Sequence, residues 1–444
     1  MRGFVDNAIA AKVRAMREGE NAHALGIVRS VAGNTVRVDG LDAIGFYERV
    51  TIGEAAEGYV SAIERDGIAV TLVRADAQIR PGDEVIACGS EFTARFSPDA
   101  CGHIVDMFGR DLMCGERFEN AYEIPIDRAP MPLMDRAPVC RPLATGIAGI
   151  DLIYPIGRGQ RQLIVGAKRS GKTQIALDTI VNQRGADVIC IYVGIGKTKR
   201  ELKEIHRDLG RQGALPYTII LAAGNDDAPS VLTLAPYVGV SMAQEYLAQG
   251  RDVLVVIDDL KRHAEAYREI GLMSGKAPGR DAYPADMFFE HARLLEKGCQ
   301  HVNGGSITIL PICESTGEDI TDYITTNIVS ITDGQIVLSR KAFEKGQKPA
   351  INYGLSVSRL GGAVQEEPMR RLGARVRRDL LSYLEAREVF ELANIDEMGA
   401  AMREKMERGA ALMDALNQYR YQPRSMRAIQ GAFEPLVGGA SRES

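Results

Sequence analysis

The 444-residue sequence contains no tryptophan, and aromatic residues make up only 6% of it. It also lacks any run near the roughly 18 consecutive apolar residues of a membrane span, so we expect no transmembrane segment. The N-terminal residues, Met-Arg-Gly-Phe-Val-Asp, lack the apolar core of a signal peptide. Seven cysteines are dispersed without a CxxC pair, and six histidines are equally scattered. This pattern indicates reduced thiols in a cytoplasm, rather than a disulfide framework or a zinc site.

The sequence also lacks an excess of positive charge, because 54 Lys and Arg face 59 Asp and Glu and the formal net charge is −5. That balance argues against a chain built mainly to hold nucleic acid, and we expect no nucleic-acid partner. Hydrophobic residues (45%) and charged residues (25%) are present in the proportions of a globular protein. The length exceeds that of one ordinary core, so two or three domains are expected.

The pattern of the chain predicts an N-terminal arm and three domains. Residues 1–22 predict a short polar helix or arm, and residues 23–89 predict a small β-barrel or sandwich, because short β-rich runs alternate with turns. Residues 90–366 predict an α/β domain, and residues 367–444 a helical domain. Predicted strands of the first domain are residues 25–29, 35–38, 58–63, 67–73 and 84–87.

Apolar strands alternate with helical patterns after residue 162, which predicts a parallel sheet covered on both faces. We expect residues 328–331 and 335–338 to form a hairpin around the Thr-Asp-Gly turn at 332–334. Residues 370–392 and 395–416 carry apolar residues at helical spacing. Predicted sheet strands are residues 162–165, 188–193, 217–222, 253–257 and 306–310.

The most informative motif is residues 166–173, Gly-Ala-Lys-Arg-Ser-Gly-Lys-Thr, between an apolar run and a helical pattern that starts at Gln174. Strand, glycine-rich turn and helix are the context of a phosphate-binding loop. The glycines allow backbone N–H groups to face phosphates, and the helix N-terminus adds partial positive charge. Lys172 can reach the β- and γ-phosphates, and the Thr173 hydroxyl can ligate Mg²⁺. An ordinary strand–turn–helix is the alternative.

Two carboxylates, Asp258 and Asp259, end the predicted strand at 253–257. In a phosphate-loop protein, an aspartate in this place holds the water shell of Mg²⁺, a role we assign to Asp258. Asp259 can instead cap the following helix. The two interpretations are compatible, one for each residue.

Lys197 follows the predicted strand at 188–193, at the sheet edge where ligands bind. An ATPase that activates water needs a carboxylate or glutamine there. A protonated lysine can bind phosphate but cannot accept a proton from water. Lys197 therefore indicates nucleotide binding without efficient hydrolysis.

Arg359 lies in a loop between serine and glycine residues, Gly-Leu-Ser-Val-Ser-Arg-Leu-Gly-Gly at 354–362. Arginine fingers act from such loops, often across a subunit boundary. Without further context, a solvated surface arginine is the more common interpretation of a loop position.

Taken together, these motifs resemble the alpha subunit of the rotary F-type ATP synthase, over about residues 24 to 430. The resembling stretches are residues 156–161, 166–173, 256–264, 266–270, 278–284, 291–296, 326–336 and 354–362. The resemblance implies a β-barrel, a central α/β RecA-like phosphate-loop NTPase domain and a C-terminal helical domain. It also indicates a divergent member whose C-terminal domain is short.

The resemblance implies a non-catalytic subunit that binds ATP or ADP with Mg²⁺ and alternates with a catalytic beta-type subunit in a hexameric ring. A central gamma-type shaft and, indirectly, a membrane ion-translocating sector are further expected partners, at the cytoplasmic face of the membrane. Arg359 matches the arginine finger that reaches into the beta-type site, and Lys348, Pro349 and Gln418 match the adenine pocket. Expected nucleotide-binding residues are Gly166, Arg169, Ser170, Gly171, Lys172, Thr173, Gln174, Asp258, Lys348, Pro349 and Gln418, with Thr173 and Asp258 also serving the metal.

Two alternatives share the phosphate-loop core. An RNA-translocating homohexameric termination factor would need a basic, aromatic-bearing platform, whereas residues 24–88 contain only Phe46, Tyr47 and Tyr59 as aromatic residues. A homohexameric protein-export ATPase would need its own catalytic carboxylate near Lys197. The family has a glutamine at the position of Lys197, and Arg420 replaces a second glutamine beside the adenine pocket.

Overall fold

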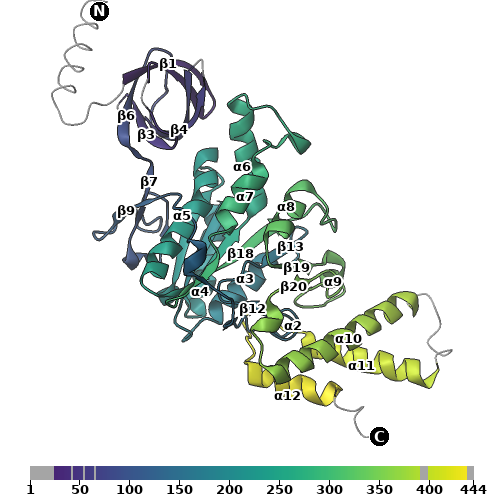
Figure 1. Cartoon of the computed structure of the whole chain (residues 1–444). Helices are drawn as coiled ribbons and strands as arrows, with labels where there is room; N and C mark the ends of the chain where they lie inside the picture. Colours follow the sequence, from purple (N-terminus) through teal and green to yellow (C-terminus); the bar gives the residue numbers. More distant parts are fainter. Residues whose placement is uncertain (1–24, 42–43, 54–55, 65–66, 391–398, 438–444) are drawn as a thin grey trace, which may run out of the picture.

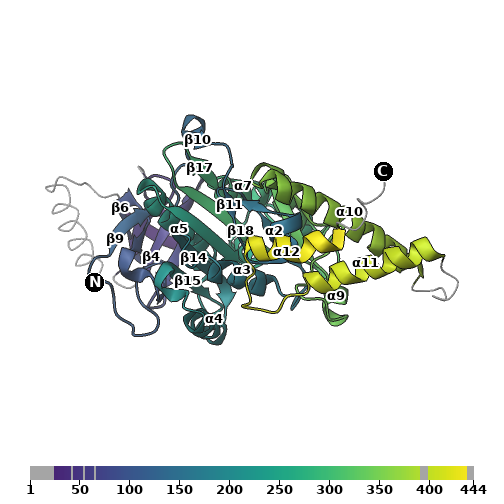
Figure 2. The same cartoon turned by 90° about the horizontal axis from the view of Figure 1, so that it is seen from below.

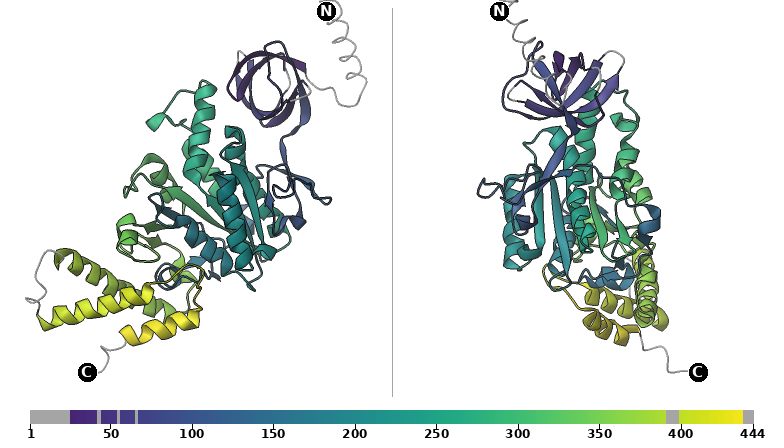
Figure 3. Two further views of the ribbon diagram at one scale, coloured as in Figure 1. Left: turned by 180° about the vertical axis from the view of Figure 1, so that it is seen from behind. Right: turned by 60° about the vertical axis from the view of Figure 1, so that its left-hand side comes forward.

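The structure is a computed structural model that describes residues 25–41, 44–53, 56–64, 67–390 and 399–437 (Figure 1). The predicted arm at 1–22 lies outside these residues. A β-barrel lies at one end of the molecule, an α/β domain in the middle and a set of helices at the other end (Figures 1 and 3). The predicted fold class is therefore confirmed, while the exact domain limits stay predictions.

The N-terminal barrel is closed, because β6 pairs antiparallel with β1 in the order β1-β2-β5-β4-β3-β6 (Figure 3). Valines on alternate positions, such as Val36 and Val38, fill its interior. The sequence pattern did not predict β3, which lies in the short polar-flanked run after Tyr47. The barrel strands are β1 (Leu25–Ala32), β2 (Thr35–Asp39), β3 (Glu48–Ile52), β4 (Ala56–Glu64), β5 (Gly67–Ala75) and β6 (Glu84–Glu91).

The central sheet has the order β20-β19-β13-β18-β16-β14-β15-β8, with β17 beside β18 and β10 beside β17. The strands from β19 to β8 run parallel, as the continuous apolar runs predicted. Its strands are β8 (Ile104–Val105), β10 (Arg136–Ala137), β13 (Leu163–Gly166), β14 (Val188–Lys197), β15 (Thr218–Gly224), β16 (Asp252–Asp258), β17 (Cys299–His301), β18 (Ser306–Glu314), β19 (Gly334–Leu338) and β20 (Val357–Ser358). Two short pairs lie outside it, β7 (Thr93–Phe96) with β9 (Tyr122–Pro125) and β11 (Pro142–Leu143) with β12 (Ile156–Gly157).

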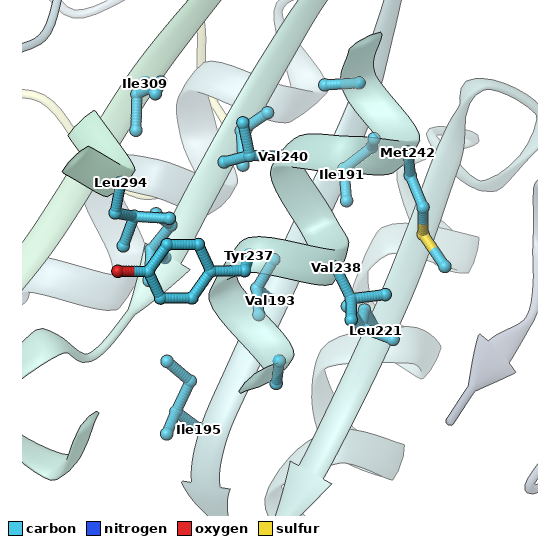
Figure 4. Packing of buried hydrophobic residues seen from close by; sticks show 14 of the residues in the cluster. Ile191, Val193, Ile195, Leu221, Tyr237, Val238, Val240, Met242, Leu294 and Ile309 are labelled. Carbon is cyan, nitrogen blue, oxygen red and sulfur yellow. The ribbon is translucent and has the colours of Figure 1, made fainter. Parts of the chain in front are cut away.

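Helices cover both faces of this sheet. Alternate residues of β14 face opposite cores, with Ile191 and Val193 packed in one and Tyr192 in the other. Figure 4 shows part of the first core, to which Tyr237 and Val238 also belong. That face is covered by α5 (Pro229–Ala248), α6 (Leu260–Met273) and α7 (Met287–Leu295), and the opposite face by α3 (Lys172–Val181) and α4 (Lys199–Arg211). Shorter helical pieces are α2 (Ala148–Ile153), α8 (Tyr323–Ile331), α9 (Arg340–Glu344), η1 (Pro98–Ala100), η2 (Leu133–Asp135), η3 (Leu215–Tyr217), η4 (Arg280–Ala282) and η5 (Gly361–Ala363).

The hairpin predicted around residues 332–334 is wrong. Residues 328–331 end α8, whose Asp322 caps the helix by accepting a hydrogen bond from the Thr325 N–H at 3.0 Å. Gly334 begins β19, which pairs with β13 and β20. A Cβ at Gly334 would lie 2.3 Å from the Val357 carbonyl oxygen, so this glycine allows close approach of β20 rather than a tight turn.

The C-terminal helices are α10 (Glu367–Phe390), α11 (Ala400–Leu416) and α12 (Met426–Val437). The first two correspond to the predicted helical segments, and α11 packs along α10. In Figure 2, α12 lies beside α2, which joins this group to the α/β domain. Among the described residues, no helix combines the length and apolar character needed to cross a bilayer.

Candidate functional site

The predicted phosphate loop joins β13 to α3 in the interior of the sheet, between β18 and β19. It therefore emerges at the carboxyl edge of the strands, where open α/β sheets bind ligands. Gly171 precedes α3 with φ 100°, and Arg169 has φ 64°. Left-handed turns of this kind point successive N–H groups inward, toward the N-terminus of the helix. The local geometry is that of an anion cradle.

Two glycines of the loop serve different needs. A Cβ at Gly166 would lie 2.7 Å from the Leu338 carbonyl oxygen and 2.9 Å from Ser170 Oγ, so a side chain there would push β19 away. At Gly171, a Cβ would meet no atom of the described chain within 4 Å. The requirement at Gly171 is its backbone conformation, which L-residues with side chains rarely adopt.

Lys172 folds back onto the loop. Its Nζ donates hydrogen bonds to the carbonyl oxygens of Gly166 and Ala167, each at 2.8 Å. Burial lowers the pKa of Lys172, against the raising effect of carboxylates that include Glu314. Ser170 Oγ is buried and has no hydrogen-bond partner in the described part of the chain. Both groups can donate hydrogen bonds to phosphate oxygens. The carbonyl oxygens of Gly166 and Ala167, which accept from Lys172 here, carry no net charge.

Asp258, at the end of β16, gathers side chains from two other elements. Its Oδ2 accepts hydrogen bonds from the hydroxyls of Thr173 at 2.6 Å and Tyr192 at 2.7 Å. Its Oδ1 accepts one from Lys197 Nζ at 2.9 Å, and Asp258 is only 2% exposed. The structure thus brings together the two residues predicted for the metal, and it adds Lys197 to them. Burial tends to lower the pKa of Lys197, but the Asp258 charge and hydrogen bond outweigh it and raise that pKa.

Thr173 and Asp258 provide the kinds of oxygen that magnesium binds, although the Lys197 ammonium already occupies one oxygen of Asp258. Mg²⁺ is bound by one or two protein oxygens, with phosphates and water completing its coordination. A hydroxyl and a carboxylate in contact provide such oxygens. Within the described residues, no group of three or more His, Cys, Asp or Glu side chains could hold a metal on its own.

Asp259 caps α6 by accepting a hydrogen bond from the Arg262 N–H at 2.8 Å, which confirms the capping interpretation. Burial, with the neighbouring Asp258 charge, raises the pKa of Asp259 to about 6. The two adjacent carboxylates therefore have different tasks, one at the helix terminus and one toward the phosphate loop.

A cavity of about 330 Å³ opens beside the N-terminus of α3, within the range of small-molecule sites. It collects the remaining residues predicted for the nucleotide: Arg169, Ser170, Gly171, Gln174, Lys348, Pro349 and Gln418. Predicted residues as far apart in the chain as Arg169 and Gln418 thus line one cavity. Arg420, which the resemblance placed beside the adenine pocket, also lines it. Sequence reasoning did not assign the other residues that line it: Ile147, Ile175, Asp178, Phe343, Ala350 and Tyr419.

Gln418 lines this cavity, but its amide is already engaged by the protein. Its Nε2 donates to the carbonyl oxygens of Gly146 at 2.6 Å and Gln422 at 2.7 Å, and its Oε1 accepts from the Ala148 N–H at 3.1 Å. Gln418 therefore holds the segment after α11 against the α/β domain, and contributes the shape of the cavity wall rather than free donors.

Two aromatic residues of the cavity, Phe343 and Tyr419, offer ring surfaces that sequence reasoning missed. They are 41% and 66% exposed, and Lys348 Nζ lies 5.7 Å from the centre of the Tyr419 ring. A flat heterocyclic base can stack on such rings. The adjacency of Tyr419 to Gln418 was the available signal, in a chain poor in aromatic residues.

A second, polar cavity of about 860 Å³ lies on the other side of the phosphate loop and includes Lys197, Glu201, Glu265 and Glu314. Glu201 is committed to capping α4, because it accepts hydrogen bonds from the Thr198 N–H at 2.8 Å and hydroxyl at 2.7 Å. Glu265 pairs with Arg262 at 3.0 Å. At the end of β14 itself, Lys197 presents an ammonium group, which cannot act as a base.

Arg359 is not part of this assembly. It directly follows β20, and its N–H donates to the Asp333 carbonyl oxygen at 2.9 Å, at the amino end of β19. The Asp333 N–H in turn bonds the carbonyl oxygen of Arg161, five residues before Gly166, so Arg359 lies roughly 16 Å along the strands from the phosphate loop. Its guanidinium is exposed and donates to the Thr332 carbonyl oxygen at 3.2 Å.

The comparisons with known proteins agree with this geometry. A model of the ATP synthase alpha/beta family, nucleotide-binding domain, matches residues 146–358. The chain is 39% identical to ATP synthase subunit alpha of Dehalococcoides mccartyi, over 90% of this chain and 80% of that one. It is 38% identical to the protein of that name from Anaplasma marginale (90% and 81%) and 39% identical to that from Dictyoglomus thermophilum (94% and 82%).

Proposed function

Because the chain belongs to the ATP synthase alpha/beta family, we propose that it is the non-catalytic alpha-type subunit of an F-type ATP synthase or ATPase that translocates H⁺ or Na⁺. In this proposal it alternates with a catalytic beta-type subunit in a hetero-hexameric ring around a gamma-type shaft. The ring lies at the cytoplasmic face of the membrane as a peripheral assembly. It is coupled indirectly to the ion-translocating sector in the membrane.

The proposed ligand is ATP or ADP with Mg²⁺. Lys172, Ser170 and the N–H groups of the loop hold the phosphates, and the base enters the cavity between α3 and the Tyr419 segment. Thr173 and Asp258 face the metal, which would supply positive charge to the β- and γ-phosphates. The protein's own part is to bind and orient the nucleotide.

The observation that carries the non-catalytic assignment is Lys197 Nζ, 2.9 Å from Asp258 Oδ1. Hydrolysis needs a group that orients water and accepts its proton. The Asp258 charge raises the pKa of Lys197 despite burial, so this group stays protonated and donates. A site with a cation in this place binds phosphate charge without activating water.

The position of Arg359 supports action in trans. Arg359 lies roughly 16 Å along the strands from the phosphate loop of its own chain. Its guanidinium therefore cannot reach a phosphate held in that loop. In a ring with heterologous interfaces, opposite sides of one subunit face different neighbours. Arg359 is therefore proposed to complete the site of the neighbouring beta-type subunit.

The test combines equilibrium ATP binding with phosphate release by the purified chain. Saturable binding with negligible turnover is expected. Native mass spectrometry of the chain alone should show no stable homohexamer. Robust turnover that disappears in Lys172→Ala or Glu314→Gln variants would contradict the proposal and favour a self-sufficient ATPase. Glu314 is included because it lines the polar cavity beside the loop.

A further inference from the structure

The Lys197–Asp258 ion pair changes the electrostatics of the place prepared for a metal. Both oxygens of Asp258 already accept hydrogen bonds from the protein, Oδ1 from the ammonium and Oδ2 from the two hydroxyls of Thr173 and Tyr192. The side chains of Lys197 and Asp258 are 18% and 2% exposed, so solvent screens the pair weakly. Protein donors therefore occupy three of the roughly four acceptor positions of this carboxylate, which leaves one position for a metal's water shell.

Backbone geometry aims Lys197 at Asp258. Gly194 of β14 is the register partner of Asp258 on β16, and the pairing of β14 with β15 shifts between Ile195 and Lys197. Gly196, inside this irregularity, has φ 64°. A bulge re-aims the side chains that follow it. The ion pair is therefore built into the end of the strand, and is not the chance meeting of two flexible side chains.

The charge balance favours a nucleotide without a metal. The +1 charge of Lys197 cancels the −1 charge of Asp258, so the pair offers a dication much less attraction than an unpaired carboxylate would. The phosphates keep the ammonium of Lys172, and the exposed Lys168 and Arg169 extend from the same loop. Positive charge that a bound magnesium ion would bring is thus already supplied in part by the protein.

We propose that Lys197 takes over the electrostatic role of Mg²⁺ at this site, so that the chain binds ATP or ADP with little dependence on Mg²⁺. The inference rests on the proposed nucleotide site and specifies how that site recognises its ligand. It requires a cation at position 197, not a particular side chain.

The experiment measures equilibrium affinity of the full chain for ATP and ADP, with excess Mg²⁺ and with EDTA. For the unmodified chain, we expect dissociation constants that agree within about threefold between the two conditions. Lys197→Gln should make EDTA weaken binding about tenfold or more, because a charge-assisted contact is lost when the metal is absent. Lys197→Arg keeps a cation and should behave like the unmodified chain.

The matched control is Lys199→Gln, which removes an exposed lysine two residues away and should leave both affinities unchanged. If the unmodified chain loses affinity in EDTA about tenfold or more, the inference is overturned while the nucleotide site stands. Absence of binding in both conditions would overturn the inference and the proposed function together. Even if Lys197→Gln fails to fold, the ratio of the dissociation constants of the unmodified chain in EDTA and in Mg²⁺ decides whether the inference holds.

Discussion

At the scale of single residues, the candidate functional groups lie at the ends of strands that are neighbours in space but distant in sequence. Asp258 and Lys197 are 61 positions apart, and their contact follows from the adjacency of β14 and β16. Each residue could be singled out from the sequence by its place after an apolar run. Their ion pair could not, because strand order and the local bulge decide it.

Lys172→Ala should weaken ATP binding by about tenfold to a hundredfold, since its ammonium, held at the loop by two carbonyl oxygens, is the proposed ligand of the phosphates. Equilibrium titration with ATP measures the loss. Lys203→Ala, at an exposed lysine of α4, is the control and should bind as the unmodified chain does. Equal affinities of the Lys172→Ala and control chains would remove the loop from the nucleotide site.

At the scale of elements, the apolar periodicity predicted the strands of the parallel sheet and the two long C-terminal helices. It failed at residues 328–331, where a run rich in β-branched residues forms the last turns of α8. Ile324 and Ile328 are four residues apart and face the core together, and the Asp322 cap fixes the start of the helix. Tertiary packing and capping outweighed strand propensity there.

The packing of α11 on α10 depends on Gly409. A Cβ at this position would lie 2.1 Å from the Tyr383 ring, so Gly409→Ala should push the helices apart and destabilise the C-terminal helices by about 1–3 kcal/mol. Denaturant unfolding or limited proteolysis of these helices measures the change. Gly431→Ala in α12 is the matched variant, because its Cβ would meet no described atom within 4 Å.

Gly431→Ala should instead be neutral or stabilise α12 by up to about 1 kcal/mol, the difference in helix propensity. A destabilisation of the same size in both variants would show that the effect comes from the helices themselves and not from contact with Tyr383.

The contact between α6 and α7 includes two buried histidines, His263 and His291, whose ring nitrogens lie 3.2 Å apart. Burial lowers the pKa of His263 to about 4, and burial with the His263 charge lowers the pKa of His291 well below its usual value. An unfolded histidine titrates near pH 6.5. Between about pH 6.5 and 4 the unfolded chain therefore binds more protons, and the free energy of unfolding falls as pH drops.

The contribution of His263 to this acid loss is about 3 kcal/mol across the window. His263→Gln should reduce the loss of the free energy of unfolding between pH 7 and pH 5 by about 2 kcal/mol, because these pH values span about 1.5 units of the window. Urea unfolding at both pH values measures the change. His301→Gln, at a partly exposed histidine, is the control. An unchanged slope in His263→Gln would show that the pair does not govern acid stability.

At the scale of the whole molecule, the residues proposed to function lie at two opposite edges of the sheet. The phosphate loop, Lys197 and the base cavity lie at the carboxyl edge of the sheet, while Arg359 lies at the amino end of β19. The sequence motifs predicted both features, but only the register of β13, β19 and β20 separates them in space. The relation of the two edges to neighbouring subunits depends on surfaces of other chains, which this sequence does not encode.

The central claim is that this chain binds nucleotide at its own site and supplies Arg359 to another. The most direct measurement is ATP turnover of a ring assembled from an Arg359→Lys chain and its beta-type partner. Loss of the planar guanidinium should lower turnover strongly, toward the roughly 10³- to 10⁵-fold effect of a lost arginine finger, although the charge remains. Ring assembly and this chain's ATP affinity should stay unchanged, because the guanidinium is exposed and remote from the loop. An assembled Arg359→Ala ring with undiminished turnover would contradict the account.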